Sequence, residues 1–140
     1  MFGLFKSKKK SAQAKILIVD DEPDYVSTVE CRLGWCGYEV IIATNGQEGL
    51  EKAESEKPDL ILLDTSMPVM NGHEMLERLR KNPELKDLPV IMATTLCDAQ
   101  NISVASSYGV VDYVAKPFDF TESMEKIAGA LQNKKTLSNV

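Results

Sequence analysis

Two groups of carboxylates stand out in the sequence because each follows an apolar run. Asp20 and Asp21 come directly after the apolar residues 16–19, and Asp64 ends a second run of this kind. Adjacent carboxylates at the end of a buried strand repel one another unless a positive group neutralises them. Carboxylates that cluster in one cleft bind hard divalent cations through oxygen, and Mg²⁺ usually takes one or two carboxylates together with phosphate oxygens. The carboxylates therefore indicate a Mg²⁺ site, provided that the fold brings them together.

The elements that would position these residues alternate regularly between strand and helix. Apolar runs predict five strands, and apolar residues at helical spacing between Asn, Gly and Pro boundaries predict five helices. The strands cover residues 16–19, 38–43, 59–64, 90–94 and 110–116, and the helices cover residues 23–36, 45–57, 72–81, 98–107 and 120–131. This alternation predicts right-handed crossovers and a parallel sheet between two layers of helices, which is an α/β fold.

The predicted strands end in residues with ionisable or hydroxyl side chains. Asp20 and Asp21 follow the first strand, Asp64 ends the third, Thr94 ends the fourth and Lys116 ends the fifth. In open parallel α/β sheets the functional site lies at the carboxyl ends of the strands. The sequence therefore predicts that three carboxylates, one hydroxyl and one ammonium group converge there.

The composition is that of one globular domain. The chain has 140 residues, of which 44% are hydrophobic, and this is enough for a single core. Its apolar runs are far shorter than the roughly 20 residues that cross a bilayer, and no signal peptide is evident, so we expect a cytoplasmic protein. One histidine and three cysteines without a CxxC pair do not supply a zinc site.

Charge is unevenly placed along the chain. Four of the 16 basic residues are lysines within residues 1–10, which contain no acid, so residues 11–140 hold 12 basic against 21 acidic groups. An acidic body of this kind is a poor binder of nucleic acid. The apolar residues beside these lysines would suit an arm that contacts a membrane or a partner, but ten residues make a weak anchor. We therefore expect a flexible basic tail over residues 1–14, without membrane contact.

Four motifs occur in register at the ends of the predicted strands. They are "VDDEP" at 19–23, "DTSMPVMNG" at 64–72, "PVIMATT" at 89–95 and "DYVAKPF" at 112–118. With these motifs, over about residues 15 to 132, the sequence resembles the receiver domain of two-component response regulators. The resemblance implies a flavodoxin-like (βα)5 three-layer sandwich with a five-stranded parallel sheet in the order 2-1-3-4-5. It also implies a receiver domain over residues 15–133 and a C-terminal tail over residues 134–140.

The resemblance implies a role for each residue of the expected site. Asp64 is the implied phosphoacceptor, a carboxylate nucleophile that forms an acyl phosphate. Asp20, Asp21 and Asp64, with the backbone carbonyl of Ser66, are the implied ligands of Mg²⁺. Lys116 is implied to bind the phosphoryl oxygens as a point charge, which suits a reaction that is assisted by positioning and charge neutralisation.

Other residues are implied to switch the protein or to shape its loops. Thr94 is implied to hydrogen-bond the new phosphoryl group, and Tyr113 to turn into the space left behind. Pro117 matches the family's cis proline, which would aim the lysine before it into the cleft. Pro68 and Gly72 are implied to shape the loop that follows the phosphoacceptor.

Three positions concern how long the phosphoryl group lasts. Thr95 stands where the family usually has alanine or glycine, and it would narrow access to the phosphoryl group. Ser66 and Leu96 occupy positions that, in the family, tune loss of this group by contacting the attacking water. Because Leu96 cannot orient water by hydrogen bonding, we expect a longer-lived phosphoryl group than in chemotaxis-type receivers.

His73 starts a predicted helix without a partner in a motif, and we expect it at the surface.

These features predict a stand-alone response regulator receiver and not an enzyme for an external substrate. It would take its phosphoryl group from a sensor histidine kinase or a histidine phosphotransfer protein. It would then act on an unknown protein target as a switch, or pass the group on in a phosphorelay. Too few residues follow the last helix for DNA binding, and pairing of two copies on phosphorylation stays open.

Other classes of function fit the sequence less well. A phosphorylation-independent interaction module is the main alternative. A phosphohydrolase that uses an aspartyl phosphate would need DxD at the first strand, where this chain has "VDDE". The sequence has no GxxxxGK[ST] motif, which excludes a P-loop nucleotide site.

Overall fold

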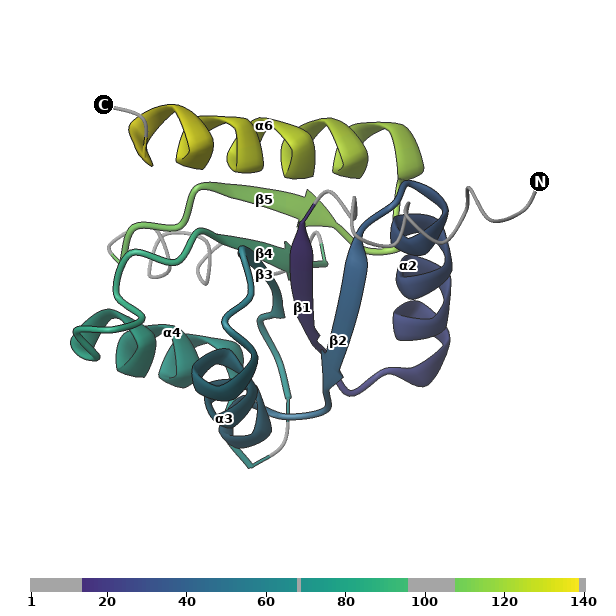
Figure 1. The fold of residues 1–140 in the computed structure, drawn as a ribbon. Helices are drawn as coiled ribbons and strands as arrows, with labels where there is room; N and C mark the ends of the chain where they lie inside the picture. The colour runs from purple at the N-terminus through teal and green to yellow at the C-terminus, as the bar shows by residue number, and fades with distance from the viewer. Residues whose placement is uncertain (1–13, 68, 96–107, 139–140) are drawn as a thin grey trace, which may run out of the picture.

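A five-stranded parallel sheet forms the centre of the molecule (Figure 1). The computed structural model describes residues 14–67, 69–95 and 108–138, with side chains as far as residue 133. The strands are β1 (Lys15–Val19), β2 (Glu39–Ala43), β3 (Leu60–Asp64), β4 (Val90–Thr94) and β5 (Asp112–Ala115). Their order is β2-β1-β3-β4-β5, which confirms the predicted flavodoxin-like topology.

Helices cover both faces of this sheet. They are α2 (Pro23–Trp35), α3 (Gly46–Glu56), α4 (Gly72–Lys81) and α6 (Phe120–Ser138). One core cluster joins α2 and α6 to the sheet through residues such as Ile18 and Leu62, and the other joins α3 and α4 through Leu17 and Leu63. Figure 1 shows the same two layers. All five residues of β3 are buried, because a central parallel strand is covered on both faces.

The register aligns the carboxyl ends of the central strands. Neighbouring strands pair near their last residues: Val19 with Leu63, Asp64 with Ala93, and Thr94 with Ala115. The residues that end or follow these strands therefore emerge at one edge of the sheet. This edge is where parallel α/β folds place their sites.

Local capping fixes the helices that begin at this edge. Asn45 accepts a hydrogen bond from the Glu48 backbone N–H at the start of α3. Asn71 and Glu74 form a reciprocal capping box at the start of α4, with bonds of 3.0 and 3.1 Å. Pro23 occupies the first turn of α2, where its missing N–H costs nothing. Each such cap typically contributes about 1 kcal/mol and holds the preceding loop in place.

The structure differs from the sequence-based elements at a few boundaries. Helix α6 continues to Ser138 and does not end near residue 131, so the predicted C-terminal tail begins inside it. Residues 132–138 contain no glycine or proline to stop a helix. Strand β5 begins at Asp112, two residues later than predicted. The helix predicted over 98–107 and most of the predicted N-terminal tail lie outside the described residues. Among the helices that are described, none is long and apolar enough to cross a bilayer.

Candidate functional site

Three carboxylates meet at the carboxyl edge of the sheet. Asp20 follows β1, and its own N–H bonds the carbonyl of Ala43 at the end of β2. Asp20 is 1% exposed and Asp64, at the end of β3, is 6% exposed, whereas Asp21 is open to solvent. One oxygen from each of Asp20, Asp21 and Asp64 lies within 4.8 Å of the others. The structure therefore brings together the three acids that the sequence placed at one site.

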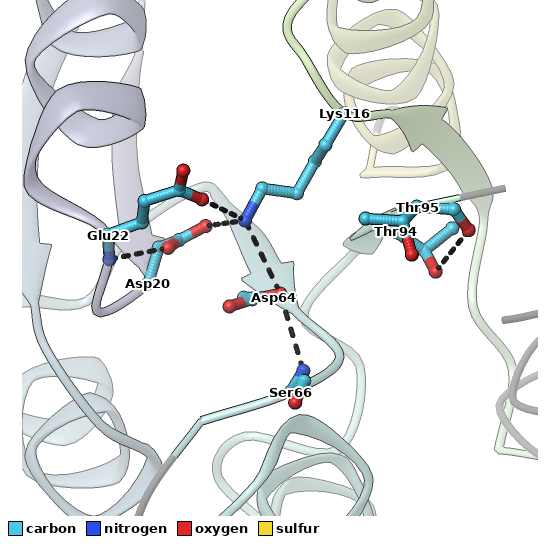
Figure 2. A network of polar contacts seen from close by, with 7 residues as sticks. All are labelled: Asp20, Glu22, Asp64, Ser66, Thr94, Thr95 and Lys116. Atoms are coloured by element: carbon cyan, nitrogen blue, oxygen red, sulfur yellow. Dashed lines mark hydrogen bonds and ion pairs between the residues drawn. The ribbon is translucent and has the colours of Figure 1, made fainter. Parts of the chain in front are cut away.

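Lys116 reaches into this cluster from the end of β5. Its Nζ lies 3.1 Å from Asp20, 3.0 Å from Glu22 and 3.7 Å from Asp64 (Figure 2). The Lys116 backbone N–H donates to the carbonyl of Thr94 and so ties this lysine to the end of β4. Lys116 is thus a positive group of the kind that adjacent acids at a strand end require.

Burial governs the protonation of this cluster. Burial raises the pKa of Asp64 to about 6, with the negative charge of Asp20 adding to the effect. Burial also raises the pKa of Asp20, although the Glu22 N–H and Lys116 oppose the change. Burial alone would lower the pKa of Lys116, but its hydrogen bond to Glu22 and the charges of Asp20 and Asp64 raise it overall. One ammonium therefore does not fully offset the buried negative charge, and a further cation would be favoured.

The cluster fits a hard divalent cation by its donor type and its burial. Carboxylate oxygens are the ligands that Mg²⁺ prefers, and two buried acids beside one exposed acid leave positions for water and phosphate oxygens. The Ser66 N–H donates to Asp64 Oδ1 at 3.3 Å, so the loop after β3 folds back beside the acids. Asp20, Asp21 and Asp64 are the residues that would hold the ion. The Ser66 carbonyl stays a predicted ligand.

An open cleft of about 840 Å³ gives access to these groups. Its lining includes Asp21, Asp64, Ser66, Thr95 and Lys116. Because the cleft is open and polar, solvent and small polar molecules can reach the Asp64 carboxylate. Thr95 lies on this wall, at the position where the sequence predicts narrowed access.

The two predicted switch residues lie on β4 and β5. Thr94 is 6% exposed, and its hydroxyl donates to the carbonyl of Thr95 (Figure 2). Tyr113 is half-buried and packs against the core cluster under α3 and α4. The Tyr113 carbonyl accepts a 2.6 Å hydrogen bond from Lys126 of α6. The switching role of both residues stays a prediction.

The residues expected to shape loops are partly visible. Gly72 packs against the Asp64 carbonyl so closely that an added Cβ would overlap the Asp64 oxygen. The peptide bond between Lys116 and Pro117 is cis. Pro68 and Leu96 lie outside the described residues.

Sequence reasoning missed three residues of the site. His73 was expected at the surface, but it is half-buried, its ring nitrogens are buried, and it lines the cleft, because the start of α4 turns inward beside Gly72. Glu22 binds Lys116 directly, and its place as the third acid of the run was the available signal. Tyr25 packs beneath Lys116, which no spacing in the sequence indicates.

Comparison with known proteins assigns the chain and its fold to one class. The family model described as the response regulator receiver domain matches residues 16–128. The chain therefore belongs to the response regulator receiver domain family.

Solved structures and curated proteins agree with this assignment. A putative response regulator from Chloroflexus aurantiacus is 32% identical, with a TM-score of 0.81 over 85% of this chain and 98% of that one. A receiver domain protein (CheY-like) from Methanospirillum hungatei is 34% identical, with a TM-score of 0.80 over 87% of this chain and 96% of that one. The probable transcriptional regulator ycf27 of Cyanophora paradoxa is 39% identical over 84% of this chain and 48% of that protein. The chain spans about half the length of the curated relatives that it matches, and this does not support the predicted stand-alone form.

Proposed function

We propose that this protein is a Mg²⁺-dependent phosphoryl acceptor whose acceptor residue is Asp64. The observation that carries the proposal is the meeting of Asp20, Asp21 and Asp64 with the Lys116 ammonium in one open cleft. Receiver domains bind Mg²⁺ at an acidic pocket, and the acids of this chain fit that ion.

The chain's own residues account for the transfer step. A carboxylate oxygen of Asp64 attacks the phosphorus of the donor, the bond from phosphorus to the donor breaks, and the donor leaves with its electron pair. Lys116, 3.7 Å from Asp64, offsets negative charge on the transferred group. Mg²⁺, when bound, supplies neutralisation of the carboxylates and the phosphoryl oxygens. The chain modifies only itself, and we propose no turnover of an external substrate.

We further propose that the acyl phosphate acts as a switch. The Thr94 hydroxyl would leave its bond to the Thr95 carbonyl and bind the phosphoryl group, and Tyr113 would follow inward. A bias of a few kcal/mol between two existing packings is enough for such a change. The output would be contact with a protein target or onward transfer of the phosphoryl group.

The lifetime of the phosphoryl group follows from the residues around it. Leu96 offers no hydrogen bond to an attacking water, and Thr95 lines the cleft. We propose slow loss of phosphate for these reasons. A Leu96→Glu variant should lose phosphate faster than the wild type, as followed by intact mass over time. An unchanged rate would refute the role of Leu96.

Receiver domains interact with histidine kinases, and we propose a histidine kinase or a phosphotransfer protein as the donor. Several curated relatives are named transcriptional regulators, but the chain matches only about half of each. Its acidic balance after residue 10 argues against nucleic-acid binding by the domain itself. Receiver domains are typically cytoplasmic, and we place this domain there.

Phosphorylation by acetyl phosphate tests the proposed function. The wild type should gain one phosphoryl adduct by intact mass in the presence of Mg²⁺ and none with EDTA, and Asp64→Asn should gain none. Asp59→Asn is a matched control, because it makes the same change at the other end of β3, where Asp59 accepts the Lys15 N–H. An adduct that persists in Asp64→Asn would refute the acceptor assignment. No adduct in the wild type would favour the phosphorylation-independent interaction module.

A further inference from the structure

Among the described contacts of Lys116, one is with an aromatic ring and not with a carboxylate. The Lys116 Nζ lies 4.5 Å from the centroid of the Tyr25 ring, in the first turn of α2. An ammonium within about 6 Å of a ring centroid is attracted by the negative face of the ring. Tyr25 is only 6% exposed, so this contact forms largely out of bulk water, where the attraction is stronger.

Packing alone holds the Tyr25 ring in place. The ring meets Phe118 edge to face, with centroids 6.4 Å apart and planes at 75°. It also belongs to the core cluster that includes Val29 and Leu33 of the same helix. The Tyr25 hydroxyl is buried and has no hydrogen-bond partner among the described residues, so the hydroxyl does not set the position of the ring. Packing therefore positions the ring without help from its hydroxyl, and the ring face is turned to the Lys116 ammonium.

The phenol offers the site no charge and no base. Burial, together with the negative charges of Asp20, Asp64 and Glu22, raises the pKa of Tyr25 well above its usual range. The side chain therefore stays neutral at physiological pH. What remains available to Lys116 is the π face of the ring.

A bound Mg²⁺ would compete with Lys116 for the carboxylates but not for the Tyr25 ring. Asp20 and Asp64 belong to the cluster that would hold Mg²⁺, so a bound ion would draw on the same negative charge that now holds the ammonium. The third acid, Glu22, has a side chain that is 58% exposed, so water and salt screen its attraction. A metal ion does not compete for the face of Tyr25.

We propose that Tyr25 is a positioning residue for phosphoryl transfer: its ring face keeps the Lys116 ammonium at the cleft once Mg²⁺ has taken the carboxylates. This inference rests on the proposed function, because it concerns the same lysine and the same reaction. Tyr25 does not contact the reacting atoms and acts only through Lys116.

Two substitutions at Tyr25 test the proposal by the initial rate of phosphorylation with acetyl phosphate at saturating Mg²⁺. Tyr25→Leu removes the ring and keeps an apolar side chain, and the rate should fall about 2- to 30-fold, the span that corresponds to cation–π energies. Tyr25→Phe loses only the hydroxyl and should keep the wild-type rate. A wild-type rate in Tyr25→Leu, or an equal loss in Tyr25→Phe, would overturn the proposal.

Tyr38→Leu controls for loosening of the core. Tyr38 is 9% exposed and belongs to the same core cluster, but it precedes β2 at the opposite end of the sheet. Tyr38→Leu should lower the free energy of unfolding and leave the phosphorylation rate unchanged. An equal loss of rate in Tyr38→Leu would assign the effect to core packing and overturn the role of Tyr25.

NMR spectroscopy tests the contact between Lys116 and Tyr25 without any phosphoryl transfer. Ring currents should shield the ε-methylene group of Lys116, which carbon-13 labelling of lysine detects and Lys116→Arg assigns. The shielding should persist on addition of Mg²⁺ in the wild type and Tyr25→Phe, and it should be absent in Tyr25→Leu. Loss of the shielding when Mg²⁺ binds to the wild type would overturn the proposal. A wild type that never accepts phosphate would refute the proposed function, whereas the shielding would still decide the contact.

Discussion

The two ends of the sheet treat charge in opposite ways. At the amino end, Arg80 of α4 donates hydrogen bonds to four backbone carbonyls, at distances of 2.7 to 3.2 Å. These carbonyls belong to Lys86, Leu88, Tyr108 and Gly109, in the segments that lead into β4 and β5. At the carboxyl end, buried Asp20 and Asp64 share one lysine. At the amino end the guanidinium has four carbonyl acceptors, although burial lowers the pKa of Arg80. The carboxyl end holds negative charge in excess.

This difference shows which end contributes stability and which end contributes chemistry. Bonds from a guanidinium to carbonyls are charge-assisted and tie together segments that are distant in sequence. Crowded carboxylates destabilise the metal-free fold, but they create the demand for a cation that the proposed reaction uses. Substitutions at the amino end should therefore change stability without changing phosphorylation, whereas substitutions at the carboxyl end should change phosphorylation.

Arg80→Met should have the largest effect on stability. It keeps the apolar stem but removes the four hydrogen bonds, and it should lower the free energy of unfolding by about 3 kcal/mol. Urea denaturation measures this change. The rate of phosphorylation by acetyl phosphate, well below the melting temperature, should match the wild type. A marked loss of rate would show that the two ends of the sheet are coupled.

Gly72→Ala should cause the largest loss of stability among the substitutions at the carboxyl end. The added Cβ would overlap the Asp64 carbonyl oxygen, so the phosphoacceptor must move. Overpacking should cost about 2 kcal/mol of stability, and a displaced nucleophile should slow phosphorylation about 100-fold. Urea denaturation and the acetyl phosphate rate measure the two effects.

Gly34→Ala is the matched control for this substitution. Gly34 lies in α2, and a Cβ there would meet nothing within 4 Å. Alanine should therefore stabilise the protein by about 0.5–1 kcal/mol and leave the phosphorylation rate unchanged. Equal behaviour of the two alanine variants would contradict the close packing at Asp64.

Asp64→Asn should stabilise the metal-free protein while it abolishes phosphorylation. Burial raises the pKa of Asp64 from 3.8 to about 6, so the folded state binds this proton more tightly than the unfolded state does. The stabilising contribution of this group is complete below pH 3.8 and is lost as the pH rises through about 6. In EDTA, the variant should gain about 2 kcal/mol of stability at neutral pH and little near pH 4.

Urea denaturation across this pH range measures the gain. Asp59→Asn, at the opposite end of β3, should not gain stability, because Asp59 accepts a hydrogen bond from the Lys15 N–H. A loss of stability in Asp64→Asn at neutral pH would mean that its carboxylate is satisfied in the metal-free protein. The contrast between the two ends of the sheet would then fail.

Lys81→Ala should have the smallest effect on the free energy of unfolding, and it is the control for loss of charge in Arg80→Met. Lys81 forms an exposed i,i+4 ion pair with Glu77 at 3.0 Å, next in sequence to Arg80. Such pairs contribute about 0.3–0.5 kcal/mol, and salt screens them. Urea denaturation at low and high salt measures this loss. A loss as large as that of Arg80→Met would show that loss of charge on α4, and not the carbonyl contacts, explains both variants.

The sequence by itself determined a parallel sheet with the site residues at its carboxyl edge, and the resemblance to receiver domains supplied the strand order. Apolar runs and helical spacing are local patterns, and the crossover rule then leaves few topologies, so the ends of β1, β3, β4 and β5 had to share one edge. Asp20, Asp21, Asp64 and Lys116 were placed by this logic and by their motifs. The end of α6 was missed because no local signal marks where a helix without glycine or proline stops.

The arrangement of the side chains around Lys116 comes from tertiary packing. No motif or spacing singled out Tyr25, and His73 was expected at the surface. Which side chain turns toward Lys116 or into the cleft depends on how α2 and α4 pack against the sheet. The elevated pKa of Asp64 likewise comes from burial by distant segments. Burial and long-range contact are properties of the packed chain, so no spacing within the sequence encodes them directly.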